Sequence, residues 1–146
     1  MGIKPLAHFT CVGQGKDAIR AQLDRLWEAG VRNILALRGD PPKGTGKFVP
    51  HPEGFAHAGE LVAFIKANYK FCVGAACYPE THPEAKSAAD DLAFLSAKVR
   101  AGADFLVTQM FFSNDAYFGF VKRLREAEIE TPVQPGVMAV QSCSLR

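Results

Sequence analysis

The chain alternates between two hydrophobic patterns, short apolar runs and longer stretches in which apolar residues recur every three or four positions. The run at residues 34–37, Ile-Leu-Ala-Leu, has the length and composition of a strand that is buried on both faces. Ile19, Leu23 and Leu26 have helical spacing, which indicates a helix with one buried face. The pattern therefore predicts strands that alternate with amphipathic helices.

The same interpretation along the whole sequence gives five strands and four helices. We expect Asp17 to cap the first helix, Gly30 to end it, and Gly102 to end the third helix. Because helical crossovers join parallel strands, this order predicts an α/β protein with a parallel sheet. The predicted strands are residues 6–11, 33–37, 71–76, 105–107 and 133–137, and the later helices are about 59–68, 87–101 and 114–128.

Two architectures fit this alternation, an open doubly wound sheet and a (β/α)8 barrel. The length of 146 residues would complete an open sheet, whereas a barrel typically takes about 250 residues. Polar residues favour the barrel, because they follow every strand and are not confined to one crevice. We therefore expect part of a (β/α)8 TIM barrel that is not closed. The polar strand ends are residues 8–10, 38–40, 78–80, 109–111 and 134–136.

Composition places the chain among ordinary globular proteins, with 48% hydrophobic and 22% charged residues. Its net charge of +2 is small and its Lys and Arg residues are scattered, so we expect no nucleic-acid partner. No apolar run approaches the roughly 20 residues that a membrane helix requires, and residues 1–6 lack the pattern of a signal peptide. These features predict a single cytoplasmic domain with no membrane partner.

The cysteines predict neither a metal site nor a disulfide framework, since no Cys-x-x-Cys pair is present. Cys72 lies in an apolar run, and we expect it to behave as a small core residue.

Arg38-Gly39-Asp40 is the most distinctive strand end, because a cation, a glycine and an acid directly follow a buried strand. Gly39 can adopt a positive φ or let a ligand approach the backbone, and the prolines at 41–42 stop the strand. The simpler interpretation is that Arg38 and Asp40 pair with each other in solvent.

Four strand-end motifs together closely resemble methylenetetrahydrofolate reductase, over a stretch from about Pro5 to Ser142. The resemblance implies an FAD-containing barrel that takes a hydride from NADH or NADPH. It implies reduction of 5,10-methylenetetrahydrofolate to 5-methyltetrahydrofolate, for methionine synthesis. The sequence does not decide between NADH and NADPH, since it carries no Rossmann glycine fingerprint. The motifs are His-Phe-Thr-Cys at 8–11, Leu-Arg-Gly-Asp at 37–40, Tyr-Pro-Glu-Thr-His-Pro-Glu-Ala-Lys at 78–86 and Thr-Gln-Met-Phe-Phe at 108–112.

The family pattern assigns two residues to the folate. Asp40 would lie beside both the flavin and the pterin, where a carboxylate stabilises a cationic form of the substrate and serves catalysis. Gln109 would bind the folate, because an amide matches the donors and acceptors of a pterin edge. From the residues alone, Gln109 could equally be a buried side chain that ties strand ends together.

The resemblance also implies a set of FAD contacts. Arg38 and Lys98 can meet the charge of the pyrophosphate, and Asp91 can accept hydrogen bonds from ribose hydroxyls. The alternatives are that Asp91 and Lys98 form a weak ion pair on a solvated helix face, and that His82 is only a turn residue. The implied FAD contacts are His8, Arg38, Gly39, Asp40, His57, Ala58, Ala76, Tyr78, His82, Pro83, Glu84, Ala85, Asp91 and Lys98.

The sequence also departs from the family. His57 replaces a tyrosine that touches the flavin, and Phe94 stands where some relatives carry a polar cofactor contact. The resemblance begins at the third barrel strand, so we expect residues 1–146 to form an incomplete FAD-binding domain. It would lack the first two strands, the catalytic glutamate of the first strand and the carboxyl-terminal end.

Three hypotheses follow: a fragment of a reductase that is inactive alone, a non-catalytic FAD-binding module, and an aldolase-like barrel. The third is disfavoured because no lysine stands at a strand end. The oligomeric state is open, a homo-oligomer of the full-length protein included.

Overall fold

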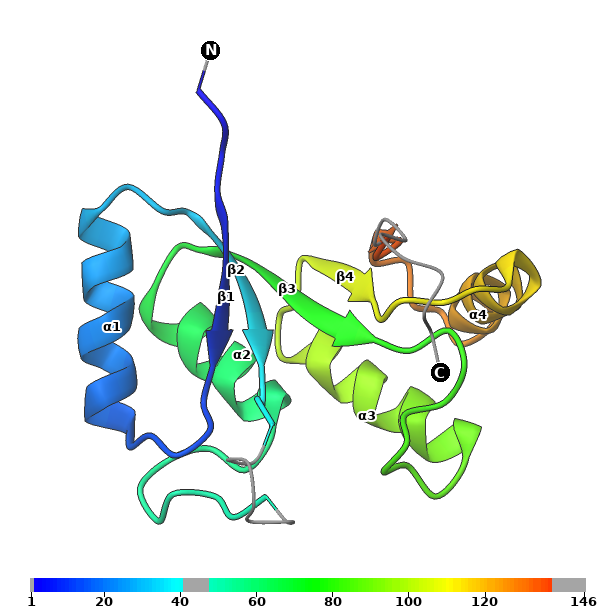
Figure 1. Ribbon diagram of the computed structural model, residues 1–146, viewed down its shortest axis with the longest axis horizontal. Helices are drawn as coiled ribbons and strands as arrows, with labels where there is room; N and C mark the ends of the chain where they lie inside the picture. The colour runs from blue at the N-terminus through cyan, green and yellow to red at the C-terminus, as the bar shows by residue number, and fades with distance from the viewer. Residues whose placement is uncertain (1, 41–47, 138–146) are drawn as a thin grey trace, which may run out of the picture.

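The computed structural model describes residues 2–40 and 48–137, which form five strands and four helices (Figure 1). The strands pair in chain order, β1-β2-β3-β4-β5, and every pair is parallel. A doubly wound sheet would reverse its strand order at a switch point, so the sequential order identifies an arc of a barrel. The prediction of a partial, unclosed (β/α)8 barrel is confirmed. The elements are β1 (Leu6–Thr10), α1 (Lys16–Glu28), β2 (Asn33–Leu37), α2 (Ala58–Asn68), β3 (Cys72–Cys77), α3 (Ala88–Arg100), β4 (Phe105–Thr108), α4 (Asn114–Glu126) and β5 (Val133–Gln134).

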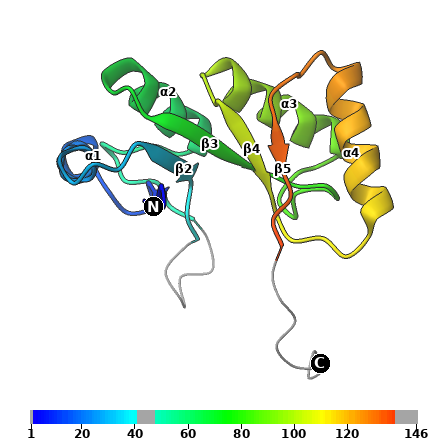
Figure 2. The same cartoon turned by 90° about the horizontal axis from the view of Figure 1, so that it is seen from above.

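The helices lie along one side of the curved sheet, as Figure 2 shows. Alternate strand residues point to this side and are buried, among them Ile34, Val73 and Leu106, each with 0% of its surface exposed. Buried residues of the helices that pack against this side of the sheet, such as Leu23 and Ile65, complete the core. The opposite, concave face of the sheet carries His8, which is exposed. The core therefore fixes the strand ends from the helical side.

Helix boundaries agree with the sequence where glycine or serine sets them. Gly30 and Gly102 have φ of +83° and +106° and follow the ends of α1 and α3, as predicted. Ser87 caps α3, and its hydroxyl accepts a hydrogen bond from Asp90 N at 3.1 Å. The prediction that Asp17 caps α1 is wrong. Gly15 occupies the cap, and Asp17 lies inside the first turn, where a carboxylate complements the helix dipole.

Two elements near the carboxyl end are shorter than predicted. Helix α4 ends at Glu126, and Glu128 has a φ of 58°, so the predicted continuation to 128 is wrong. Strand β5 contains only Val133–Gln134, because Pro135 has no N–H for the ladder. Gly136 N instead donates to the hydroxyl of Thr108 at 2.9 Å.

The prediction that Cys72 is a core residue is wrong, because its thiol is exposed. Cys72 pairs in register with Asn33 and lies on the face of β3 that no described helix covers. Cys77, five residues later, points to the helices and is buried, and burial raises the pKa of its thiol to about 12. Successive residues of a strand point to opposite faces of the sheet, so these two cysteines, five positions apart, lie on opposite faces of β3. Composition does not show which of the two faces is buried.

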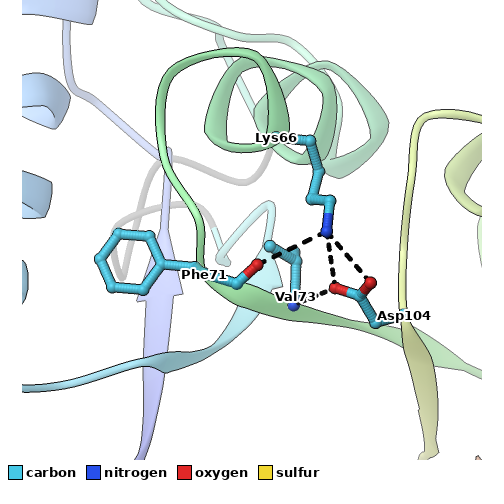
Figure 3. A network of polar contacts seen from close by, with 4 residues as sticks. All are labelled: Lys66, Phe71, Val73 and Asp104. Carbon is cyan, nitrogen blue, oxygen red and sulfur yellow. Dashed lines mark hydrogen bonds and ion pairs between the residues drawn. The ribbon is translucent and has the colours of Figure 1, made fainter.

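A polar network joins α2, β3 and β4 at the amino ends of the strands (Figure 3). Lys66 Nζ lies 3.0 and 2.9 Å from the two carboxylate oxygens of Asp104 and 3.5 Å from Phe71 O. Asp104 also accepts a hydrogen bond from Val73 N at 2.7 Å. In a barrel this end serves stability, and the opposite end carries function.

Candidate functional site

The predicted strand-end segments lie along one edge of the sheet, because all five strands run in the same direction. The backbone joins neighbouring ends directly. Cys11 N donates to Leu37 O at 3.2 Å, and Gln109 N donates to Cys77 O at 2.7 Å. The loops after β1, β2, β3 and β4 therefore share the edge at which barrels place their functional groups.

Arg38, directly after β2, forms a two-point ion pair with Glu84 of the loop after β3. Nη1 lies 2.6 Å from Oε2 and Nη2 lies 2.9 Å from Oε1, and 24% of the arginine side chain is exposed. Its hydrogen bonds raise the pKa of Arg38 and lower the pKa of Glu84. The interpretation that Arg38 pairs with Asp40 is wrong, because the planar guanidinium matches the geometry of the Glu84 carboxylate while Asp40 is exposed.

Gly39 holds the turn after β2 against the loop after β1. Its φ is +87°, and a Cβ atom there would lie 2.7 Å from Cγ1 of Val12 and 3.1 Å from Cβ of Thr10. The thiol of Cys11 lies 3.6 Å from Arg38 O on the same turn. Only glycine fits this conformation and this space, so the backbone of Arg38-Gly39-Asp40 has one fixed path.

His82 organises the loop after β3. Its backbone N donates to Asp91 Oδ2 at 3.1 Å, and its Nδ1 accepts from Glu84 N at 3.0 Å. Its ring meets the ring of Tyr78 edge-on, with centroids 4.5 Å apart, and burial raises the pKa of that tyrosine. Ala85 N closes the turn on His82 O at 2.9 Å. His82 therefore lies in a turn, and this turn places the carboxylate of Glu84 against the guanidinium of Arg38.

Lys98 brings a buried amine from α3 to the end of β3. Its Nζ donates to Ala76 O at 2.6 Å, and burial lowers the pKa of the amine. The interpretation of Asp91 and Lys98 as a weak ion pair on a solvated face is wrong, because the two residues line a cavity of about 20 Å³ instead. That volume suffices for about one water molecule. Although Lys98 belongs to a helix, its amine lies at a strand end, where the sequence predicts no lysine.

The start of α2 lies beside Lys98. A Cβ atom at Gly59 would lie 3.6 Å from Cγ of Lys98. His57 is the N-cap residue, and Glu60 Oε2 accepts hydrogen bonds from His57 N at 3.2 Å and from Ala56 N at 2.7 Å. His57 and Ala58 therefore begin a helix whose first turn lies against the aliphatic part of the Lys98 side chain.

Gln109 borders an open pocket of about 190 Å³ between the loops after β3 and β4. Its side chain is exposed, and its Oε1 accepts from Met110 N at 3.1 Å. The alternative of a buried glutamine that ties strand ends together is wrong, because backbone atoms make that connection. The pocket is lined by Tyr78, Pro79, Glu80, Thr81, Pro83, Gln109, Met110 and Phe111.

The described residues contain no group of three His, Cys, Asp or Glu side chains placed to hold a metal ion. Among the four helices described, none is long and apolar enough to cross a membrane.

Comparison with known proteins identifies the family. The family model for methylenetetrahydrofolate reductase matches residues 1–145. The chain therefore belongs to the methylenetetrahydrofolate reductase family.

Curated members of the methylenetetrahydrofolate reductase family are longer than this chain. The 5,10-methylenetetrahydrofolate reductase of Escherichia coli K12 is 40% identical over 141 residues, which cover 97% of this chain and 46% of the relative. Methylenetetrahydrofolate reductase 2 of Saccharomyces cerevisiae is 38% identical over 144 residues, with 96% and 24% covered. Methylenetetrahydrofolate reductase (NADH) 1 of Zea mays is 39% identical over 151 residues, with 96% and 26% covered. The chain thus spans between about a quarter and half of these relatives.

Among solved structures, 7,8-dihydropteroate synthase from Vibrio fischeri ES114 superposes with a TM-score of 0.58. The match covers 97% of this chain and 46% of that chain at 16% sequence identity. At this identity the likeness concerns the fold alone, and it agrees with the barrel arc described above.

The residues implied by the methylenetetrahydrofolate reductase pattern divide into two groups. Contacts described above connect one group, at the ends of β2 and β3. The other residues lie along the same edge, and no hydrogen bond or ion pair among residues 2–40 and 48–137 ties the side chains of His8 or Asp40 to the first group. The connected group is Arg38, Ala76, Tyr78, His82, Glu84, Ala85, Asp91 and Lys98.

Two further residues lie at this edge: Arg123, which the sequence does not indicate, and Glu80, which belongs to a predicted polar strand end but to which the sequence assigns no role. Arg123 of α4 donates from Nη2 to Pro79 O at 3.1 Å and lines the cavity beside Lys98. Glu80 lines both that cavity and the Gln109 pocket. Glu80, three residues after β3, belongs to a polar strand end that the sequence marks, whereas nothing in the spacing of Arg123 points to the site.

Proposed function

We propose that the chain forms the flavin-binding arc of an enzyme that reduces 5,10-methylenetetrahydrofolate to 5-methyltetrahydrofolate with NADH or NADPH as the hydride donor. Membership of the family supports this proposal. The observation that carries it is the pair of cations at the ends of β2 and β3, the bidentate Arg38 and the buried amine of Lys98. Both groups keep N–H donors beyond those that Glu84 and Ala76 O engage, and fixed cationic donors at one edge suit a dianionic pyrophosphate.

The residues present fit FAD by several tests. The turn at Gly39 leaves no room for a side chain, and Gly39 itself is only partly buried. The half-buried ring of Tyr78 offers an aromatic face and a hydroxyl, and the carboxylate of Asp91 can accept hydrogen bonds from ribose hydroxyls. Lys98 uses one of its N–H groups on Ala76 O and keeps further donors for a phosphate. When bound, the flavin would accept the hydride from the nicotinamide and deliver it to the folate.

The protein's own groups would bind and orient. Arg38 and Lys98 would donate hydrogen bonds to the pyrophosphate, and His82 would hold the loop that carries Glu84 in place. The exposed carboxylate of Asp40 would stabilise positive charge on the folate, and the amide of Gln109 would bind the pterin edge. We assign no residue of this chain as the acid that protonates the folate nitrogen.

A second candidate function is flavin binding without catalysis. The connected group of eight residues lies entirely within this arc, although curated relatives are about two to four times longer. Such an arc could hold a flavin while the residues that complete the reaction are supplied elsewhere.

The test is titration of the purified chain with FAD, followed by flavin absorbance and fluorescence. We expect binding that Arg38→Ala weakens at least tenfold. Lys122→Ala, an exposed cation on α4, is the matched control and should bind like the wild type. Folate-dependent oxidation of NADH or NADPH by the loaded chain would support the reductase, and flavin binding without it would favour the second candidate. A chain that binds no FAD would contradict both.

A further inference from the structure

The pocket beside Gln109 has the size of a single ring system. Its volume is about 190 Å³, which is below the roughly 300–1,000 Å³ of pockets that enclose a whole drug-sized ligand. It opens at the functional edge, between the loops that follow β3 and β4. A bicyclic heterocycle is therefore a better match than a complete dinucleotide.

The walls of this pocket are flat and firmly held. Tyr78 packs edge-on against His82, and Phe111 stacks on Tyr117 with centroids 5.2 Å apart and an angle of 12° between the ring planes. Pro79 adds a rigid wall, and Arg123 donates to its carbonyl at 3.1 Å. Aromatic rings that their neighbours hold in place are suited to contact the flat ring of a ligand, because these side chains lose little conformational entropy on binding.

Two polar groups of complementary kind border the pocket. The Oε1 of Gln109 accepts from Met110 N, so the amide keeps its NH2 group as a donor toward a ligand. Glu80 supplies a carboxylate, which only accepts hydrogen bonds when ionised. Within residues 2–40 and 48–137, no hydrogen bond or ion pair engages that carboxylate. The pocket thus offers one donor group and one unused pair of acceptor oxygens.

A 2-amino-4-oxo pterin presents the complementary pattern. Its 2-amino group and adjacent ring N–H are neighbouring donors, and the 4-oxo group is an acceptor. Two parallel hydrogen bonds to a carboxylate are a strong, directional arrangement. An exposed glutamate is more often a solvated surface residue, but Glu80 borders this pocket together with an amide that the family pattern assigns to the folate.

We propose that Glu80 is a substrate-binding residue that accepts both hydrogen bonds from the donor edge of the pterin, while Gln109 donates to its 4-oxo group. This inference rests on the proposed function, since it presupposes that the pocket receives a folate. It adds a specificity determinant that discriminates folates with a 2-amino group from analogues without one.

The test measures binding of 5-methyltetrahydrofolate and of its 2-desamino analogue to the whole chain by calorimetry. We expect Glu80→Gln to weaken binding of 5-methyltetrahydrofolate at least tenfold, and to weaken binding of the 2-desamino analogue, which keeps only the ring N–H donor, by a clearly smaller factor. Glu126→Gln, an exposed glutamate on α4, should behave like the wild type. An FAD affinity of the Glu80→Gln variant equal to that of the wild type would show that the edge at the carboxyl ends of the strands is still correctly folded.

Equal binding of 5-methyltetrahydrofolate by the wild type and Glu80→Gln would overturn the inference and leave the proposed function standing. An equally large loss of affinity for both ligands would also overturn the inference, because Glu80 would then not discriminate ligands by their 2-amino group. A wild-type chain that binds FAD but neither folate would contradict the reductase proposal and this inference together.

Discussion

Arg38 and Glu84 are 46 residues apart in the chain, and their side chains form two parallel hydrogen bonds of 2.6 and 2.9 Å. The pair joins the end of β2 to the loop after β3. It fixes the plane of the guanidinium, because both terminal nitrogens are engaged at once. The ring of Phe48 lies 4.8 Å from the guanidinium carbon and completes its surroundings. Any anion that binds Arg38 therefore meets a group that is already oriented.

Glu84→Gln should lower stability slightly and in a pH-dependent way. The ion pair with Arg38 holds the pKa of Glu84 below its usual value of 4.5, so the stabilisation is present above that value and is lost as pH falls through the folded pKa. Because 59% of the Glu84 side chain is exposed, we expect a difference below about 1 kcal/mol at pH 7. Urea unfolding of both proteins between pH 3 and 7 measures it.

The control for that measurement is Glu126→Gln, whose ion pair with Lys122 spans 3.8 Å on an exposed helix face. A stability difference between wild type and Glu84→Gln that stays constant from pH 7 to pH 3 would contradict the assignment of the ion pair.

Lys98→Met should change how stability depends on alkaline pH. Burial lowers the pKa of Lys98 below 10.5, so the unfolded chain binds more protons than the folded chain in the interval between these values. The wild type should therefore gain stability relative to Lys98→Met as pH rises toward 10.5. The same variant should bind FAD at least tenfold more weakly, since it loses a phosphate donor.

Chemical denaturation from pH 7 to 10.5 and FAD titration at pH 7 provide the two measurements. Lys122→Met, with an exposed amine, should show neither effect. Parallel pH profiles for wild type and Lys98→Met would show that the amine is solvated in the folded chain.

The fold was predictable because local patterns determine it. Helical spacing in residues such as Ile19 and Leu23 and the glycine at 30 specify α1 without reference to the rest of the chain, and the same holds for α3. Two kinds of feature were predicted wrongly: contacts with a partner distant in sequence, and the face of the sheet to which a strand residue points. Cys72 and Cys77 belong to the same apolar run, and only the parity of β3 separates the exposed from the buried thiol.

The family resemblance names residues of the candidate site but not the contacts between them. The resemblance groups Arg38, Glu84 and Lys98 as FAD contacts, which stays a prediction, and the structure places their side chains at adjacent strand ends. No local rule gives Arg38 the partner Glu84 over its neighbour Asp40, because that choice depends on how the loop after β3 folds around His82.

Gly74→Ala should destabilise the chain by about 1–3 kcal/mol through overpacking. Gly74 pairs in register with Phe105, and a Cβ atom at Gly74 would lie 2.5 Å from two atoms of the phenylalanine ring. Phe105→Leu should recover part of the loss in the double variant, because the smaller side chain vacates that space. Thermal unfolding of both single variants and the double variant measures the coupling, and additive losses would contradict the contact.

Asp104→Ala should separate stability from binding. The variant removes the acceptor of Val73 N and the two-point partner of Lys66, both shown in Figure 3. A part-buried N–H without its partner and a lost ion pair together should cost about 1–3 kcal/mol. Because this network lies at the amino ends of the strands, FAD affinity should remain within twofold of the wild type under conditions where the variant is folded. Glu130→Ala, an exposed carboxylate near β5, is the control for loss of charge. If Asp104→Ala weakened FAD binding as strongly as Arg38→Ala, the two ends of the sheet would be coupled, and the functional site would extend through β3 and β4.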